Sequence, residues 1–236
     1  MRHSTTFLMS LIVASILVLM FLNLVLGSVS IPLKSVWNII CGLGDEPVTW
    51  QNIVWKSRLP QALTALVAGA GLAISGLQMQ TVFRNPLAGP SVLGISSGAS
   101  MGVAFVVLLS GSLGGVALSK LGVMGEIALS IAAVIGSLSV MALIVYVSQK
   151  VKGNVTLLII GVMIGYVANA VIGVLKFFSV EEDIRAYVIW GLGSFSRVSG
   201  NQMMLFVAIM AILIPLSFLL LSLIHISEPT RLALIS

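Results

Sequence analysis

Six stretches of this 236-residue chain contain no aspartate, glutamate, lysine or arginine. They cover residues 3–33, 59–83, 85–119, 127–149, 153–175 and 198–227. A helix needs roughly 20 mostly apolar residues to cross the hydrocarbon core of a bilayer, and every stretch is long enough. Charged residues make up only 8% of the chain, whereas soluble domains contain about 25%. The sequence therefore excludes a water-soluble globule.

We predict an all-α integral membrane protein with spans near residues 7–27, 60–83, 91–110, 127–148, 155–177 and 201–222. A helix satisfies its own backbone hydrogen bonds in lipid, and the alternating pattern of membrane barrel strands is missing. A signal peptide is the alternative for the first span. Its apolar region would be about 7–15 residues long and end at a small-x-small cleavage site, and no such site follows Leu26. An even number of spans places both chain ends on one side of the membrane.

The polar stretch between the first two spans contains a short amphipathic segment. Pro32 suits the first turn of a helix, and Gly42 suits its end. Four apolar residues between them are predicted to share one helical face: Leu33, Val36, Trp37 and Ile40. We expect this helix to lie on the membrane surface.

Small residues recur at four-residue spacing in three of the predicted spans. Such stripes let helix backbones approach closely in a membrane. They comprise Ala65, Gly69 and Ala73, then Gly94, Gly98 and Gly102, then Gly161, Gly165 and Gly173. Asn169 continues the last stripe and is expected to face a neighbouring helix or a wet cavity. Packing and a role in a translocation pathway both remain open for Gly161, Gly165 and Asn169.

The predicted spans carry no set of residues for catalysis or metal binding. His3 and His225 lie at the extreme ends, Cys41 is the only cysteine, and no phosphate-binding G-x-x-x-x-G-K-[ST] loop occurs. We therefore predict that the protein is not an enzyme and has neither cofactor nor metal. Its net charge of +5 is spread over the loops, so nucleic acid is not an expected partner. If transport uses ATP, the ATPase must be a separate chain.

A long motif lies around the junction of the second and third predicted spans. Ser57-Arg58-Leu59-Pro60-Gln61 precedes the second span, and an Asn-Pro-Leu-Ala-Gly-Pro run follows it. Asn-Pro and Gly-Pro form turns, so the run predicts a tight re-entry turn, in which Pro90 starts the next helix. The residues of this turn motif are Arg84, Asn85, Pro86, Leu87, Ala88, Pro90, Gly94 and Gly98.

This motif resembles the permease subunits of bacterial ABC importers for iron siderophores, haem and vitamin B12, the FecCD or BtuC-like family. The resemblance extends to Trp190-Gly191-Leu192-Gly193-Ser194 and covers residues 1 to about 221. It implies a helical permease of ten spans, of which six are present here. It also implies a second permease copy in a homodimer or pseudo-dimer, cytoplasmic ATPase subunits and an external substrate-binding protein.

The resemblance also implies a location and several residue roles. It places the protein in the bacterial plasma membrane with a cytoplasmic amino terminus, although the distribution of lysine and arginine alone favours the reverse. Arg58 and Lys56 are expected to dock the binding protein, with Gln61 standing where the family has a second arginine. Gly153 and Asn154 are expected at a cytoplasmic gate.

Residues 1–221 are expected to form the amino-terminal part of the permease domain, and residues 222–236 to be a non-native tail on a non-functional fragment. The family's ATPase-docking run does not occur. A ferric siderophore is the substrate expected first, with haem and cobalamin as alternatives. A six-span structural or assembly protein and an intramembrane enzyme are the competing classes, and neither accounts for the run from Asn85 to Ala99.

Overall fold

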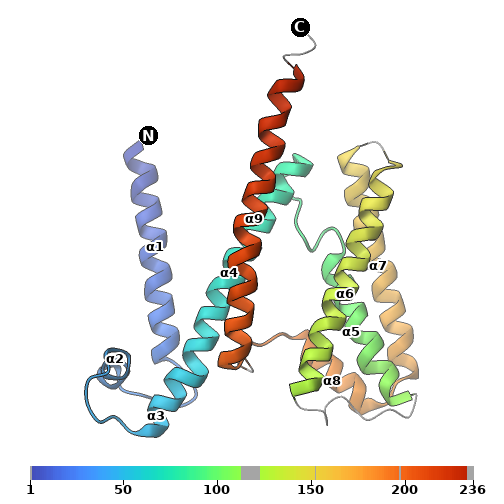
Figure 1. Ribbon diagram of the computed structural model, residues 1–236. Coiled ribbons are helices and arrows are strands. Elements are labelled where there is room, and N and C mark those ends of the chain that lie inside the picture. The colour runs from blue at the N-terminus through green and yellow to red at the C-terminus, as the bar shows by residue number, and fades with distance from the viewer. Residues whose placement is uncertain (1, 113–122, 152, 197, 233–236) are drawn as a thin grey trace. The chain divides into compact units, whose positions relative to one another are not determined.

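The computed structural model describes residues 2–112, 123–151, 153–196 and 198–232. The regular elements in these ranges are all helical, as the membrane prediction requires (Figure 1). The chain divides into two compact units, Met1–Leu72 with Phe195–Ser236 and Ala73–Ser194. The helices are α1 (Arg2–Val25), α2 (Leu33–Cys41), α3 (Val48–Ile53), η1 (Val54–Arg58), α4 (Leu59–Phe83), α5 (Ile95–Ser112), α6 (Val123–Ser148), α7 (Asn154–Phe178), α8 (Glu181–Gly191) and α9 (Gly200–Leu232).

Five of the six predicted spans correspond to helices that are long and apolar enough to cross a membrane. These are Thr6–Val25, Val48–Phe83, Met124–Ser148, Val155–Phe178 and Gly200–Leu220. The third predicted span, residues 91–110, corresponds to the shorter apolar helix Ile95–Leu109. Its start was predicted too early because residues 90–94 form turns. The second predicted span, residues 60–83, coincides with α4, and helix continues back to Val48 through the π-helical turn η1 and α3.

The first unit has a small core where the end of α1 meets α2 and η1. It is formed by Leu24, Ile31, Val36, Ile39, Val54 and Ala62. Val36 and Ile39 form the buried face of α2, whereas Leu33, Trp37 and Ile40 are exposed. Val36 therefore lies at the buried edge of the predicted apolar face, and the other three residues lie on its exposed part. Apolar residues form an almost continuous surface on α2. Contact with α1 and η1 determines that Val36 and Ile39 are the ones that are buried.

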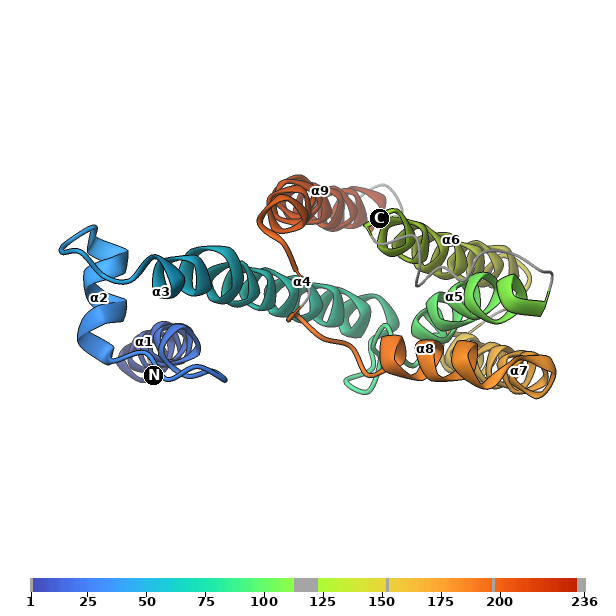
Figure 2. The ribbon, with the colours of Figure 1, turned by 90° about the horizontal axis from the view of Figure 1, so that it is seen from below.

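The second unit is arranged around α5, which packs against α6, α7 and α8 (Figure 2). One apolar cluster joins the carboxyl-terminal half of α5 to Ile172 of α7 and Tyr187 of α8. Another joins the residues before α5 to Val140 of α6 and Leu158 of α7. The residues before α5 therefore lie at the same end of this unit as the turn between α6 and α7.

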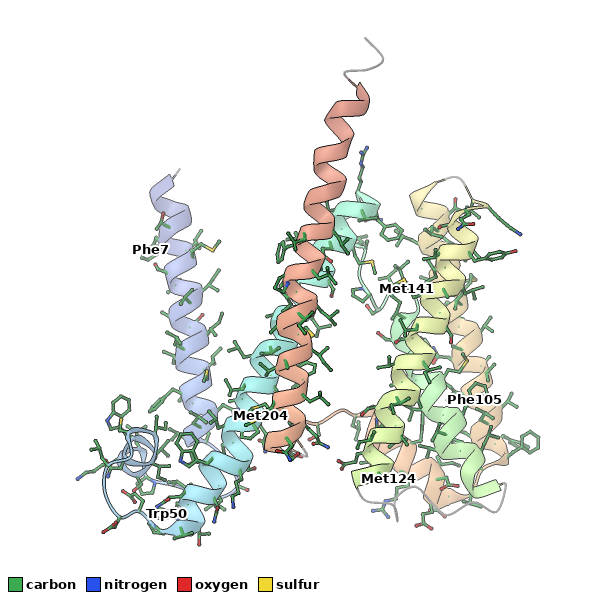
Figure 3. The ribbon with its side chains drawn as sticks, viewed as in Figure 1. Phe7, Trp50, Phe105, Met124, Met141 and Met204 are labelled. Carbon is green, nitrogen blue, oxygen red and sulfur yellow. The ribbon has the colours of Figure 1, made fainter. Side chains whose placement is uncertain are left out.

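Both units expose many large apolar side chains. Phe7 and Met204 are exposed in the first unit, and Phe105 and Met124 are exposed in the second (Figure 3). A soluble monomer rarely exposes continuous apolar surface of this kind. Exposure along whole helices is what a lipid-facing surface requires.

Candidate functional site

The turn motif begins where α4 ends, in a left-handed residue that is not glycine. Arg84 has a φ of 48°. The backbone N–H of Asn85 donates to the carbonyl of Gln80 at 3.2 Å, and the N–H of Arg84 donates to that of Thr81 at 3.3 Å. This pair of bonds is the Schellman pattern, in which glycine is the usual left-handed residue. Arg84 therefore holds a strained backbone conformation at the first residue of the motif.

We expect Arg84→Gly to stabilise this turn. The left-handed conformation costs a non-glycine residue about 1–2 kcal/mol, a cost that glycine avoids. Glycine also has greater conformational freedom in the unfolded chain, and this freedom offsets part of the stabilisation. The expected result is a free energy of unfolding higher by less than about 1 kcal/mol, measured by denaturation in mixed micelles. Arg84→Ala is the control and should not raise the free energy of unfolding. A lower free energy of unfolding for Arg84→Gly would mean that the arginine side chain stabilises the protein by more than the backbone strain costs.

Side-chain hydrogen bonds fix the centre of the motif. The Oδ1 of Asn85 accepts a hydrogen bond from the backbone N–H of Leu87 at 2.9 Å. The amide of Gln80 donates to the carbonyl of Pro86 at 3.1 Å. Ala88, which follows, is buried, whereas Leu87 is exposed. The Asn-Pro pair therefore forms the predicted turn and directs Ala88 into the unit.

Pro90 starts a single turn and not α5. The N–H of Leu93 donates to the carbonyl of Gly89 at 3.4 Å, but Gly94 then adopts a φ of 72° and interrupts the helix. The prediction that Pro90 begins the next long helix was wrong for this reason. A side chain at Gly94 would be strained, and its Cβ would lie 2.7 Å from the carbonyl oxygen of Gly161.

The motif rests on the glycines of α7 through backbone contacts. A Cβ at Gly161 would lie 2.8 Å from the Cα of Leu93, and one at Gly94 would lie 3.1 Å from the nitrogen of Gly165. Three glycines from two of the predicted stripes thus meet at one place. This contact leaves no room for a methyl group at Gly94 or Gly161, whereas a Cβ at Gly165 would make ordinary contacts at 3.4 Å or more.

The next part of α5 contacts α6 in the same way. A Cβ at Gly98 would lie 2.7 Å from the carbonyl oxygen of Gly136, and one at Gly102 would overlap the carbonyl of Ala132. Ala132 and Gly136 were missed by the sequence analysis. Ala132 and Gly136 are four residues apart, the same spacing that identifies the other stripes, so this spacing could have pointed to them.

The predicted stripe of α7 changes face after Gly165. Ala168 and Ile172 are buried, whereas Asn169 and Gly173 are exposed, and a Cβ at Gly173 would meet no atom within 4 Å. An α-helix has about 3.6 residues per turn, so each four-residue step turns the stripe away from the contact. Within the described residues, Asn169 does not extend the glycine contact.

The predicted gate residues lie at the start of α7. Gly153 precedes the helix with a φ of 118°, and its carbonyl accepts a hydrogen bond from Leu157 at 3.3 Å. Asn154 is the first helical residue. This turn lies at the same end of the second unit as Ala88 and Leu93, because both residues share a cluster with Leu158.

Arg58 is buried, with 5% of its surface exposed. Its guanidinium donates to the carbonyls of Leu24 at 2.7 Å and Val25 at 2.8 Å, and also to that of Val29. These carbonyls belong to the end of α1 and to the chain that follows it. Arg58 therefore caps α1 across a large sequence separation, while the neighbouring Lys56 is exposed.

Asp183 in the first turn of α8 is a buried carboxylate. Its Oδ2 has no hydrogen-bond partner in the described part of the chain. Burial raises the pKa of Asp183 above its ordinary value, and the neighbouring charge of Glu182 raises it further. On the next turn, burial raises the pKa of the Tyr187 phenol, and a hydrogen bond with Ser100 of α5 lowers it.

We expect Asp183→Asn to stabilise the second unit slightly at neutral pH. A raised pKa means that folding favours the neutral carboxyl, so its stabilising contribution is present at low pH and is lost as the pH rises through the folded-state pKa. The variant should remove that part of the pH dependence. Unfolding followed from pH 4 to pH 8 would measure it, with Glu181→Gln at an exposed position of the same turn as control. An unaltered pH profile would contradict the expectation.

Among the residues that the structure describes, no three histidine, cysteine, aspartate or glutamate side chains are grouped to hold a metal ion. The notable arrangement is instead the turn motif, which begins at the strained Arg84 and contacts the glycines of α7. Such an arrangement can hold helices closely together at one end of a bundle.

Comparison with known proteins shows to which family this chain is similar. A model of the FecCD transport family matches residues 15–228. The vitamin B12 import system permease protein BtuC of Serratia proteamaculans is 35% identical over 164 residues, covering 70% of this chain and 46% of that protein. BtuC of Klebsiella pneumoniae is 34% identical over 164 residues, covering 69% of this chain and 46% of that protein.

A solved structure supports the same fold. An inward-facing metal-chelate type ABC transporter aligns with a TM-score of 0.64 and 25% identity, over 84% of this chain and 56% of the other. This chain spans about half the length of the curated relatives it matches. Its helices, turn motif and family match agree, and the chain belongs to the FecCD transport family.

Proposed function

We propose that this chain forms part of the membrane-spanning permease subunit of an ATP-driven importer. The observation that carries the proposal is the turn motif seated on the α7 glycines, within a chain that matches the FecCD family over residues 15–228. The expectation of a non-enzymatic protein follows from this role. ATP hydrolysis then belongs to partner subunits.

The proposed substrate is a metal chelate. The similar solved structure is a metal-chelate type transporter, and the similar curated permeases import vitamin B12. Cobalamin is therefore a specific candidate beside the ferric siderophore that we expected from the sequence, and haem stays an alternative. These chelates share a large organic ligand around a metal, so one apolar pathway can serve the class.

The proposed partners are a second permease copy, cytoplasmic ATPase subunits and an external binding protein. The proposed location is the bacterial plasma membrane, with the amino terminus in the cytoplasm. Five membrane-span candidates in the described residues support a multi-pass protein.

Docking of the binding protein is proposed near Lys56 and Arg58. Lys56 is exposed and is available to an acidic partner. Since the guanidinium of Arg58 is bound to carbonyls at the end of α1, Arg58 would affect docking by positioning this end of the chain.

The gate is proposed at Gly153 and Asn154. The turn at Gly153 adopts a φ of 118°, a conformation that glycine reaches without strain, and it adjoins the cluster that holds the turn motif. Gly161 and Gly165 are proposed as the packed base of the pathway, and Asn169 as a polar group facing a part of the transporter outside this chain.

The proposal is tested by a chimera in which residues 15–228 replace the matching part of BtuC. The chimera is expressed with its ATPase and binding protein in cells that lack their own permease. Uptake of labelled cobalamin, ferric siderophore and haem is measured with the matching binding protein for each. ATP-dependent uptake of one chelate is expected.

Membrane insertion and ATPase binding of the chimera serve as assembly controls. If the assembled chimera imports none of the three chelates, the proposed function is wrong. Uptake of cobalamin alone would replace the siderophore proposal with the vitamin B12 alternative.

A further inference from the structure

Helix α2 carries a second apolar face that no described residue covers. Val36 and Ile39 are buried in the core of the first unit. Leu33, Trp37 and Ile40 are 59%, 57% and 39% exposed. Their spacing of four and three residues places them on one stripe. The stripe lies beside the buried face, and Lys34 and Asn38 follow on its other side.

α2 lies across the end of α1. In Figure 1 α1 is seen from the side and α2 along its axis, while in Figure 2 α2 is seen lengthwise and α1 along its axis. The apolar part of α1, Thr6–Val25, is a membrane-span candidate. α2 begins at Leu33, a few residues after that span ends. If α1 crosses the membrane, a helix across its end is placed to lie in the plane of the membrane interface.

The position of α2 relative to α1 is held by specific contacts. Arg58 donates to Leu24 and Val25 in the last turn of α1 and to Val29 in the connection to α2. Val36 packs in the same cluster as Leu24 and Val54. The depth of the exposed stripe is therefore set by the depth of α1.

We propose that Leu33, Trp37 and Ile40 form an interfacial anchor that inserts into the boundary between lipid headgroups and acyl chains. Leu22 in the last turns of α1 and Leu26 directly after it are also exposed, so apolar side chains are open on both sides of the connection to α2. Tryptophan favours this boundary, and a lysine beside the stripe can reach lipid phosphate. This inference concerns membrane contact and does not depend on transport.

A lipid surface explains the stripe better than a protein partner does. Protein interfaces usually combine an apolar centre with a polar rim that supplies hydrogen bonds. Here the helix has apolar residues on two adjacent faces, Lys34 and Asn38 follow the exposed stripe on its other side, and Ser35 is buried against the protein. That is the distribution of a helix lying in a bilayer surface and held to its own protein.

The chain offers its own probe, because Cys41 is its single cysteine and is exposed at the end of α2. The full chain is reconstituted in vesicles of phosphatidylcholine and phosphatidylglycerol. A nitroxide label is placed on native Cys41, and then on single cysteines at Leu33, Trp37 and Ile40 in a Cys41→Ser background. Collisions with oxygen, which concentrates in lipid, and with a water-soluble nickel chelate are compared. Lys34→Cys and Asp45→Cys are the controls.

The three stripe labels should show a severalfold higher ratio of oxygen to nickel collisions than the labels at Lys34 and Asp45. The native Cys41 label should give an intermediate ratio and tests the unmodified α2. Stripe labels as open to nickel as Asp45 would overturn the proposal. Labels shielded from both reagents would indicate a protein partner or a second copy and would also overturn it. Either outcome leaves the uptake experiment unaffected.

Discussion

Replacing Arg58 with alanine is expected to release the end of α1 and to cause a large loss of stability in the first unit. The guanidinium donates to the carbonyls of Leu24, Val25 and Val29. Hydrogen bonds to charged groups contribute about 1.5–3 kcal/mol each, so we expect the free energy of unfolding to fall by about 3 kcal/mol or more. Denaturation in mixed micelles measures the loss, and hydrogen exchange at residues 22–30 locates it.

Two variants separate this role from that of a simple surface charge. Arg58→Lys keeps the charge but lacks the planar fork that reaches several carbonyls, so it should restore only part of the lost stability. Lys56→Ala, at an exposed position two residues earlier, should leave stability almost unchanged. If Arg58→Lys is as stable as the original chain, or if Lys56→Ala is equally destabilising, capping of α1 is not the main role of Arg58.

Gly27 provides an independent check of the same contact. A Cβ at Gly27 would lie 2.8 Å from Nη2 of Arg58. Gly27→Ala should therefore push the guanidinium from its carbonyls and increase hydrogen exchange over the same residues. Since a flexible side chain can move, the effect should be smaller than that of Arg58→Ala.

Gly136→Ala is expected to force α5 and α6 apart. A methyl group at Gly136 would overlap the carbonyl of Gly98 and lie 3.0 Å from the nitrogen of Gly102. Overpacking of well-packed contacts costs about 1–3 kcal/mol, and backbone atoms have less room to move than side-chain ends. We expect a loss in that range, measured as the free energy of unfolding of the second unit.

Gly173→Ala is the matched control for this prediction. It makes the same substitution in a helix of the same unit, where the new Cβ would meet no atom within 4 Å. Alanine is the better helix former by up to about 1 kcal/mol, so this variant should be neutral or slightly more stable. Equal losses at Gly136 and Gly173 would show that the close approach of α5 and α6 is not the cause.

The location of the spans follows from the sequence alone. Exclusion of charge from hydrocarbon acts on each segment separately, so uncharged windows identify helices without knowledge of their neighbours. The turn around Asn85 was predictable for a similar reason, since Asn-Pro chemistry is local. The extension of helix back to Val48 was not, because the π-helical turn η1 lies where Arg58 reaches α1.

Only the tertiary structure decides which small residues make contacts. Gly161 and Gly173 belong to the same predicted stripe, yet a Cβ at Gly161 would lie 2.8 Å from the Cα of Leu93, whereas one at Gly173 would meet no described atom within 4 Å. The rotation of α7 against α5 makes this difference, and a four-residue repeat alone does not specify it. Gly136 was missed although it follows Ala132 at the same four-residue spacing as the other stripes.

The role of Arg58 likewise depends partly on the sequence and partly on the tertiary structure. The sequence determines that a basic residue lies at the start of the second span, within a motif typical of the FecCD family. The tertiary structure decides that this charge is buried, because the carbonyls that bind it are 29 to 34 residues away in the chain. Local patterns determine where a membrane helix forms, whereas contacts between distant segments decide which of its residues face protein and which face lipid.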